Sequence, residues 1–376
     1  MQYRRFGKTE LNLSVFSLGT MRSLSSAETF QATLAAAIDQ GINHVETARG
    51  YGQSEALLGQ SLQNLPSTQR DQLTITTKIS PTPDAATMAQ QITESLGRLQ
   101  VNHIDCLAIH GINTVEHLSW VTAPQGCMAA VKAAQEAGQI RHVGFSTHGS
   151  LEVIEGAIAT GLFEFVNLHY YLFFQRHRPA VELAQAEDMG VFIISPGDKG
   201  GQLYQPSETL RSLCDPFEPL HLSYRWLLRD PAITTLSLGP ATPAELAYPL
   251  QVADQTGPLT AAEQAALERL GAQADVALGD SQCHQCYACL PCPEEINIPE
   301  VLRLRNLAVA YDMTEFGQYR YGMFERAGHW FPGRRGDRCT DCGDCLPRCP
   351  SQLPIPDLLR ETHKLLKGPE RRRLWG

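Results

Sequence analysis

The chain has 376 residues with a formal net charge of -9, a length that suits one large domain with a small appendage. The acidic balance and the absence of a long basic stretch argue against nucleic acid as a partner. The N-terminus has no apolar signal region and no apolar run is long enough to span a membrane, so we expect no membrane partner.

Short β-branched runs alternate with helical stretches from about residue 16 to residue 239. The predicted strands cover 15–18, 42–46, 73–78, 104–110, 140–146, 165–169, 191–195 and 233–238. Helical stretches lie between them, including 28–40, 85–99, 126–137 and 179–189. Eight such repeats in roughly 250 residues predict an α/β fold of the (β/α)8 TIM barrel type. An open doubly wound sheet is the alternative, but the Gly-x-Gly-x-x-Gly expected after its first strand is absent.

The composition changes after Gly279-Asp280 to cysteine, proline and arginine. We therefore predict a barrel domain at 1–278 and a mostly helical, ferredoxin-like domain at 279–376. The tail 370–376 is basic with one Trp, and it is either simply solvated or a docking segment for an acidic, ferredoxin-type electron carrier.

Eight cysteines of the C-terminal part fall in two closely spaced runs. The runs are Cys283-x2-Cys286-x2-Cys289-x2-Cys292-Pro293 and Cys339-x2-Cys342-x2-Cys345-x3-Cys349-Pro350. The second has the bacterial ferredoxin spacing, in which the last cysteine binds the other cluster; the first is one residue shorter before its last cysteine. We therefore predict two [4Fe-4S] clusters with crossed ligation. One set is Cys283, Cys286, Cys289 and Cys349, and the other is Cys339, Cys342, Cys345 and Cys292.

Zinc and disulfides are the alternatives for these cysteines. A structural zinc site usually has two ligand pairs separated by a longer insert, which four cysteines in about ten residues do not provide. Thiolate-bound clusters need reduced cysteines, so we expect a cytoplasmic protein.

Three consecutive predicted strands end on an ionisable residue, namely Glu46, Lys78 and His110, and Tyr51 follows five residues after Glu46. In a (β/α)8 barrel the chemistry lies at the carboxyl ends of the strands, so these four side chains should converge. The alternative is four unrelated polar residues at strand ends.

The set suits reduction of a carbonyl group. A free tyrosine has a pKa near ~10, and a neighbouring ammonium lowers that pKa by stabilising the tyrosinate. Glu46 would hold Lys78 charged, His110 would hydrogen-bond the substrate oxygen, and Tyr51 would protonate that oxygen as hydride reaches the carbon.

Several spaced motifs carry a family resemblance. They are Arg4-Arg5-Phe6-Gly7-Lys8-Thr9, Gly41-Ile42-Asn43-His44-Val45-Glu46-Thr47-Ala48, Tyr51-Gly52-Gln53-Ser54-Glu55, Thr77-Lys78 and His110. Up to about residue 270 the chain resembles the aldo-keto reductases, and with its cysteine runs it resembles their branch with a C-terminal ferredoxin-like domain. The resemblance implies NADP(H) as cofactor and a catalytic tetrad of Glu46, Tyr51, Lys78 and His110. The family has Asp where this chain has Glu46.

The resemblance also implies nucleotide contacts. Ser146 and Asn167 are expected to hold a carboxamide or a ring edge, although the family motif Ser-Asn reads Ser146-Thr147-His148 here. Ile194 stands near the position where many members stack a Tyr on the nicotinamide. The adenosine-binding end, usually rich in Glu and Asn, reads Glu245-Leu246-Ala247-Tyr248-Pro249.

Loops after the seventh and eighth strands of such barrels commonly bind phosphate, with glycines that let backbone N–H groups approach oxygen. We therefore expect phosphate contacts in these two loops, or else ordinary glycine-rich turns. The candidate residues are Ser195, Pro196, Lys199, Gly200, Gly239 and Thr242.

Nicotinamide moves two electrons as hydride whereas an iron–sulfur cluster moves one, so the two exchange electrons only through an intermediate such as a flavin. Three hypotheses follow. The clusters feed electrons to a flavin or substrate in the barrel; or the barrel is an NADPH reductase with structural or redox-sensing clusters; or the protein is a non-enzymatic electron-transfer or regulatory module.

The loops 111–125 and 170–178, with Trp120, Phe173 and Phe174, favour an apolar or aromatic small-molecule carbonyl substrate. Three histidines are expected at the same rim, as satisfied side chains or as a metal site: His148, His169 and His177.

Overall fold

The computed structural model describes residues 1–369, and the contacts within it define two compact units. The first unit comprises Met1–Gly200 and Ser223–Pro258, and the second comprises Gly201–Leu222 and the chain from Leu259 onward. The boundary after residue 278 is a different division, drawn from composition, and it stays a prediction. The basic tail 370–376 lies outside the described residues, so its docking role also stays a prediction.

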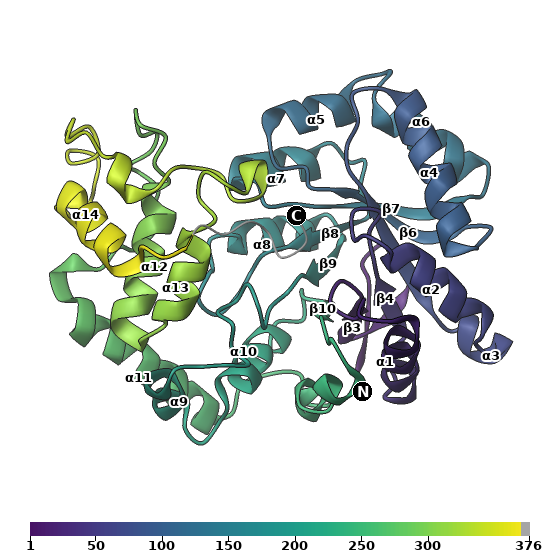
Figure 1. The fold of residues 1–376 in the computed structure, drawn as a ribbon, viewed down its shortest axis with the longest axis horizontal. Helices are drawn as coiled ribbons and strands as arrows, with labels where there is room; N and C mark the ends of the chain where they lie inside the picture. Colours follow the sequence, from purple (N-terminus) through teal and green to yellow (C-terminus); the bar gives the residue numbers. More distant parts are fainter. Residues whose placement is uncertain (370–376) are drawn as a thin grey trace. The chain divides into compact units, whose positions relative to one another are not determined.

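Eight parallel strands close into a barrel in the order β10-β3-β4-β5-β6-β7-β8-β9 (Figure 1). They are β3 (Phe16–Gly19), β4 (His44–Glu46), β5 (Thr74–Ile79), β6 (Ile104–His110), β7 (Ile140–Ser146), β8 (Phe165–Leu168), β9 (Gly190–Ile193) and β10 (Thr235–Leu238). Each end lies within two residues of its predicted position, and the (β/α)8 fold class is confirmed.

Helices follow the strands around the barrel. They are α1 (Ala27–Asp39), α2 (Ser54–Gln63), α3 (Ser67–Arg70), α4 (Ala85–Leu99), α5 (Val115–Thr122), α6 (Cys127–Glu136), α7 (Leu151–Ala159), α8 (Arg178–Ala186) and α10 (Pro219–Leu228). After β10 the connection is two short 3-10 helices, η1 (Pro243–Leu246) and η2 (Pro249–Val252).

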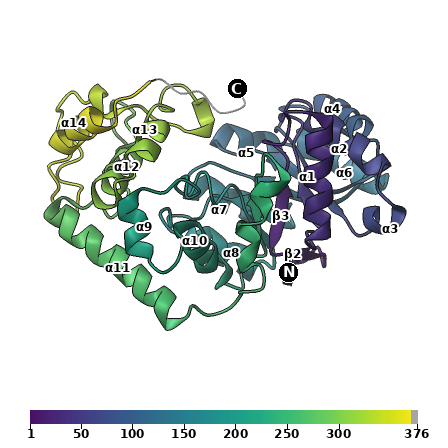
Figure 2. The same cartoon turned by 60° about the horizontal axis from the view of Figure 1, so that its bottom comes forward.

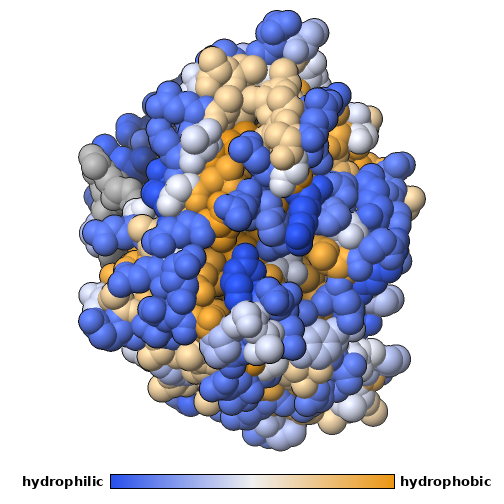
Figure 3. All heavy atoms as spheres, turned by 90° about the vertical axis from the view of Figure 1, so that its right-hand side faces the viewer, coloured by the Kyte–Doolittle hydropathy of each residue, from blue (hydrophilic) through white to orange (hydrophobic). Residues whose placement is uncertain are grey.

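Helix α4 illustrates how the sequence sets these helices. Asp84 caps its start by accepting the backbone N–H of Thr87 at 2.8 Å, and Gln100 ends it in the left-handed region at φ 53°. Met88, Ile92 and Leu99 repeat at helical spacing and are buried, each burial contributing about 1.5–3 kcal/mol. On the face where α2, α3, α4 and α6 lie, hydrophilic residues cover most of the surface (Figure 3).

A hairpin of β1 (Tyr3–Arg5) and β2 (Asn12–Ser14) precedes the barrel and was not predicted. It places Phe6 in the buried core, where its ring centroid lies 5.1 Å from that of Phe165. Gly7 has φ 54° and forms an isolated antiparallel β-bridge with Met189. A Cβ on Gly7 would lie 2.3 Å from the backbone nitrogen of Gly190. Only glycine therefore fits this close approach of two backbones.

The second unit is helical (Figure 2). Its helices are α9 (Glu208–Cys214), α11 (Ala261–Leu278), α12 (Ile298–Tyr311), α13 (Thr314–Tyr321) and α14 (Ile355–Leu366). Helix α12 packs against α11, α13 and α14 and is buried on nearly every face. The buried charge of Arg303 in this helix is paired with a carboxylate of the same helix, because Arg303 Nε donates to Glu300 at 2.8 Å. Among residues 1–369, no helix has both the length and the apolar composition needed to cross a bilayer.

Candidate functional site

The predicted ionisable residues of β4, β5 and β6 meet at the carboxyl end of the barrel. Glu46, Lys78 and His110 are all buried, with 5%, 1% and 8% of their surface exposed. The Lys78 ammonium donates to the Glu46 carboxylate and to the carbonyl of Thr47, the latter at 3.0 Å. The lysine is thus held between two oxygen acceptors at the end of β4.

Tyr51 lies in the turn that follows β4, beside both Lys78 and His110. Its ring centroid lies 5.0 Å from Lys78 Nζ and 5.7 Å from the His110 ring, which it meets nearly edge-on at 83°. A backbone bond from Tyr51 N–H to the carbonyl of Ala48, at 3.0 Å, shapes the turn that brings the ring back. The structure therefore brings together the four side chains that the sequence singled out.

Opposing effects act on the charge of Lys78. Burial, and then the charge of Lys199, hold the pKa of Lys78 below its usual range. The carboxylate of Glu46 favours the charged form. Lys78 thus loses its proton more easily than a surface lysine does. It lies beside Tyr51, and its positive charge can lower the pKa of that phenol.

Two small residues make room for the glutamate. A Cβ on Gly19, the last residue of β3, would lie 2.8 Å from Glu46 Oε1 and 3.0 Å from the carbonyl of Leu238. Ser237 on β10 donates to the same Oε1 at 3.1 Å. The longer acid is therefore accommodated by the space at Gly19 and fixed by Ser237. Neither residue was singled out from the sequence, because nothing in its local pattern marks it.

The predicted contacts to a carboxamide lie side by side on neighbouring strands. Ser146 on β7 pairs in register with Asn167 on β8, and Ser146 Oγ accepts the N–H of Gly111 at 3.1 Å. Asn167 is fully buried, yet its amide nitrogen and oxygen have no hydrogen-bond partner among the described residues 1–369. Such groups are costly unless something else pairs with them, so Asn167 fits a ligand that both donates and accepts.

The loop after β9 is a tight turn. Ser195 lies in the left-handed region at φ 52°, and its carbonyl accepts the N–H of Lys199 at 2.9 Å. A Cβ on Gly200 would lie 2.0 Å from the carbonyl oxygen of Pro196, so the turn requires glycine there. The ammonium of Lys199 lies 3.5 Å from Nε2 of His148, in the loop after β7.

The loop after β10 is held by side chains that the sequence did not point to. Arg22 donates to the carbonyl of Gly239 at 2.7 Å and to Glu245 at 3.0 Å. The same carboxylate accepts the N–H of Ala241, also at 3.0 Å, while Thr242 forms the N-cap of η1. A phosphate approaching this loop would meet Glu245 as well as the backbone.

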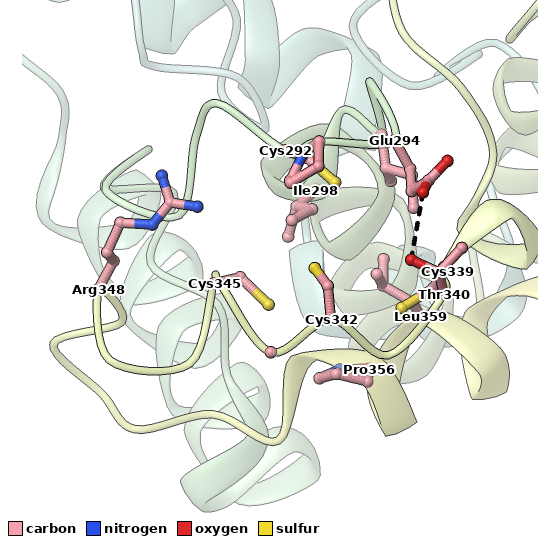
Figure 4. A pocket seen from close by; sticks show the side chains of 13 residues that line it. Cys292, Glu294, Ile298, Cys339, Thr340, Cys342, Cys345, Arg348, Pro356 and Leu359 are labelled. Atoms are coloured by element: carbon pink, nitrogen blue, oxygen red, sulfur yellow. Dashed lines mark hydrogen bonds between the residues drawn. The ribbon is translucent and has the colours of Figure 1, made fainter.

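The eight cysteines line two separate cavities of the second unit. One cavity is lined by Cys283, Cys286, Cys289 and Cys349, and the other by Cys292, Cys339, Cys342 and Cys345. Each cavity thus combines three cysteines of one run with the last cysteine of the other. Figure 4 shows the second cavity, where the sulfur atoms of Cys292, Cys342 and Cys345 point toward a common space.

The two runs share one backbone geometry although their spacing differs. Equivalent positions take the left-handed conformation in both runs, although most of these residues are not glycine. The pairs are Gln285 and Asp341, Tyr287 and Gly343, and Glu295 and Gln352, with φ between 51° and 80°. Left-handed non-glycine residues are strained and concentrate at functional sites. The repeated strain points to two equivalent binding loops.

The cysteines fit iron–sulfur clusters better than a single ion. Among residues 1–369, no three His, Cys, Asp or Glu side chains are arranged to hold one metal ion. The cysteines instead surround cavities, as thiolate ligands of a multi-iron cluster do. Burial, and then neighbouring thiolates, raise the pKa of Cys289 to about 12, a cost that bound iron would offset with its positive charge.

Comparisons with known proteins agree with a barrel site and a separate cysteine-rich part. Residues 15–272 match the aldo/keto reductase family, and residues 282–353 match a 4Fe-4S dicluster domain. Similar proteins include the Bacillus subtilis oxidoreductase YqkF, 25% identical over 68% of this chain and 92% of its own. The L-glyceraldehyde 3-phosphate reductase of Escherichia coli is 27% identical over 39% of this chain and 46% of its own.

Among solved structures, the aldo-keto reductase AKR11C1 of Bacillus halodurans has a similar fold. It superposes with a TM-score of 0.63 and 21% identity, covering 72% of this chain and 96% of its own.

Proposed function

Since the chain belongs to the aldo/keto reductase family and carries a 4Fe-4S dicluster domain, we propose that its barrel reduces the carbonyl group of a small molecule while two [4Fe-4S] clusters occupy the second domain. The observation that carries the proposal is the placement of Lys78 against Glu46 and beside Tyr51.

Tyr51 is the proton donor in this proposal. The ammonium of Lys78 stabilises the tyrosinate left behind, and Glu46 with the carbonyl of Thr47 keeps that ammonium in place. His110, edge-on to the Tyr51 ring, hydrogen-bonds the carbonyl oxygen and orients it toward the phenol. Proton delivery by a positioned group contributes typically about 100-fold to 10000-fold in rate.

The nucleotide that this reaction needs is NADP(H) in our proposal, and a bound nicotinamide supplies the hydride. Asn167 and Ser146 would hold its carboxamide, which both donates and accepts and so suits the amide of Asn167, unpaired among the described residues. Ser195, Pro196, Gly200, Gly239 and Thr242 would line its phosphates. Lys199 was predicted for the same role, and its position beside His148 also suits an anionic group of the substrate.

The clusters are bound by crossed ligation in our proposal, with Cys349 completing the set of the first run and Cys292 the set of the second. The cysteine composition of the two cavities supports this arrangement. The clusters would exchange single electrons with a ferredoxin-type carrier, and a flavin would be needed wherever these electrons meet hydride chemistry. Reduced thiols are kept in the cytoplasm, where we place the protein.

Anaerobic purification followed by analysis of iron, sulfide, flavin and nicotinamide tests the proposal. We expect about eight iron and eight sulfide per chain, as two [4Fe-4S] clusters require, and NADPH-dependent reduction of a test aldehyde. Zinc in place of iron would contradict the cluster assignment. Inertness toward aldehydes and ketones with NADPH and with reduced flavin would contradict the assignment of the barrel.

A further inference from the structure

Three consecutive loops at the carboxyl end of the barrel bring a lysine and two histidines together. His148 follows β7, His169 follows β8 and Lys199 follows β9. The ring centroids of the two histidines lie 4.0 Å apart, and Lys199 Nζ lies 3.5 Å from His148 Nε2. Lys199 and His169 are buried, with 9% and 7% of their surface exposed. These residues come from distant parts of the sequence, so the cluster is a product of the fold.

The hydrogen bonds of the cluster constrain its donors and acceptors. An ammonium only donates, so in the 3.5 Å contact with Nε2 of His148 the donor is Lys199. Tyr171 donates its hydroxyl to the carbonyl of Ile194 at 2.7 Å, so Nδ1 of His169 is the donor to that hydroxyl oxygen. His177 Nδ1 donates to the carbonyl of His169 at 2.8 Å and anchors the strand end.

The backbone around the cluster is equally well held. The N–H of His148 donates to Oδ1 of Asn113 at 2.7 Å, and the N–H of Thr147 to the carbonyl of Asn167. Lys199 is positioned by the turn at Ser195. The side chains of the cluster are therefore held in place before any ligand binds, and the Lys199 ammonium is its cationic donor.

The cluster lies close to the candidate catalytic residues. His148 is two residues beyond Ser146, which pairs in register with His110 on β6. The charge of Lys199 is also near enough to Lys78 to lower the pKa of that lysine. The two groups of residues therefore lie at the same end of the barrel.

We infer that Lys199 and His148 bind an anionic group of the substrate, so that the preferred substrates are aldehydes or ketones bearing a carboxylate or a phosphate. The inference rests on the carbonyl-reducing function proposed above and names the substrate class of that site. An ammonium and an imidazole N–H are donors suited to these oxygens, and partial burial makes such charge-assisted bonds stronger than they are in water.

A phosphate of the bound nucleotide could also be the anion that Lys199 and His148 contact, so the experiment must distinguish it from an anionic group of the substrate. Steady-state kinetics with NADPH should compare 4-carboxybenzaldehyde with benzaldehyde, which differ only in the anionic group. We expect the wild-type kcat/KM to be at least tenfold higher for the charged aldehyde. In Lys199→Met and in His148→Phe this ratio should fall at least tenfold, whereas Lys199→Arg should keep most of it.

Matched controls make the result specific. Lys132→Met removes an exposed lysine of α6 and should leave the ratio unchanged. Iron content and far-UV circular dichroism show whether each variant folds. Equal losses with both aldehydes, together with a weaker Kd for NADPH, would assign Lys199 to the nucleotide and overturn the inference.

A binding measurement separates failure of this inference from failure of the proposed function. Calorimetric titration of the holoprotein with succinate or inorganic phosphate, without nucleotide, should show binding that Lys199→Met weakens at least tenfold. Binding without any carbonyl turnover would support the anion site and reject the reductase. Turnover without a preference for the charged aldehyde and without anion binding would reject the site alone.

Discussion

Lys78 Nζ lies 5.0 Å from the centroid of the Tyr51 ring while its ammonium also contacts the Glu46 carboxylate. A cation this close to an aromatic ring is attracted to it, and the same charge stabilises the deprotonated phenol. Because the Lys78 ammonium contacts both the Glu46 carboxylate and the Tyr51 ring, the protonation state of Lys78 should govern the rate of carbonyl reduction.

The pH profile of kcat/KM should show this directly. Burial and Lys199 lower the pKa of Lys78, so the ammonium is lost at a lower pH than in an ordinary lysine, whose pKa is about 10.4. Activity should therefore decline as pH rises, beginning well below pH 10. Lys199→Met removes one of the lowering charges and should move this decline to higher pH. A profile that is flat up to pH 10 would contradict the role given to Lys78.

The space at Gly19 should matter for turnover. In Gly19→Ala the new methyl group would press on Ser237 Oγ, on Glu46 Oε1 and on the carbonyl of Leu238, so the carboxylate and the serine that holds it must shift. We expect kcat to fall at least tenfold with little change in cluster content. Gly97→Ala, where a Cβ meets nothing within 4 Å, is the matched control and should retain activity. Equal activities in the two variants would argue that Glu46 does not need its present position.

Crossed ligation makes a prediction about which cysteine variants resemble each other. Cys349→Ser should alter the same electron paramagnetic resonance signal as Cys283→Ser, although Cys349 belongs to the second run. Cys342→Ser should alter the other signal, as Cys292→Ser does, and lower the iron and sulfide content by about half. Ser351→Ala changes no sulfur ligand and serves as the control. If Cys349→Ser and Cys342→Ser affected one and the same signal, ligation would follow the runs instead.

His44 should make the barrel sensitive to acid. It is fully buried between Ser17 Oγ at 2.6 Å and Thr76 Oγ1 at 2.7 Å, and burial, with a further effect of Lys78, lowers its pKa to about 3. Below about pH 6.5 the unfolded chain binds a proton at this position that the folded chain does not, so the free energy of unfolding decreases as the pH is lowered. Above that pH His44 does not affect how the free energy of unfolding depends on pH.

Urea denaturation at several pH values measures this effect. Between pH 7 and pH 5, His44→Gln should lose about 2 kcal/mol less stability than the wild type, since about 1.4 kcal/mol accompanies each unit of pKa difference. Identical losses in the two proteins would show that His44 also binds a proton in the folded state.

Much of the fold could be predicted because it depends on local patterns. The strand ends at Glu46, Lys78 and His110 followed from β-branched runs, and parallel strands in a barrel present their carboxyl ends together. The three cysteines that each run contributes to one cavity could be grouped from their local spacing, and the fourth from the ferredoxin pattern in which a run shares its last cysteine; that these sets bind clusters stays a prediction.

Other features depend on contacts between distant residues and left no local signal. The strands of the N-terminal hairpin have only three residues each, too few for a periodic pattern. The room that Gly19 leaves for Glu46 and the approach of Lys199 to His148 exist only once the barrel is closed. The sequence could name the chemistry of these side chains but not their distances.

Single-turnover reduction of 4-carboxybenzaldehyde with NADPH, compared between the wild type and Tyr51→Phe at matched iron content, measures the contribution of the Tyr51 hydroxyl. If Tyr51 donates the proton, the variant should react at least about 100-fold more slowly with its cluster spectrum unchanged. An unchanged rate in Tyr51→Phe would contradict the assignment of Tyr51 as the acid, and with it the mechanism proposed for the barrel.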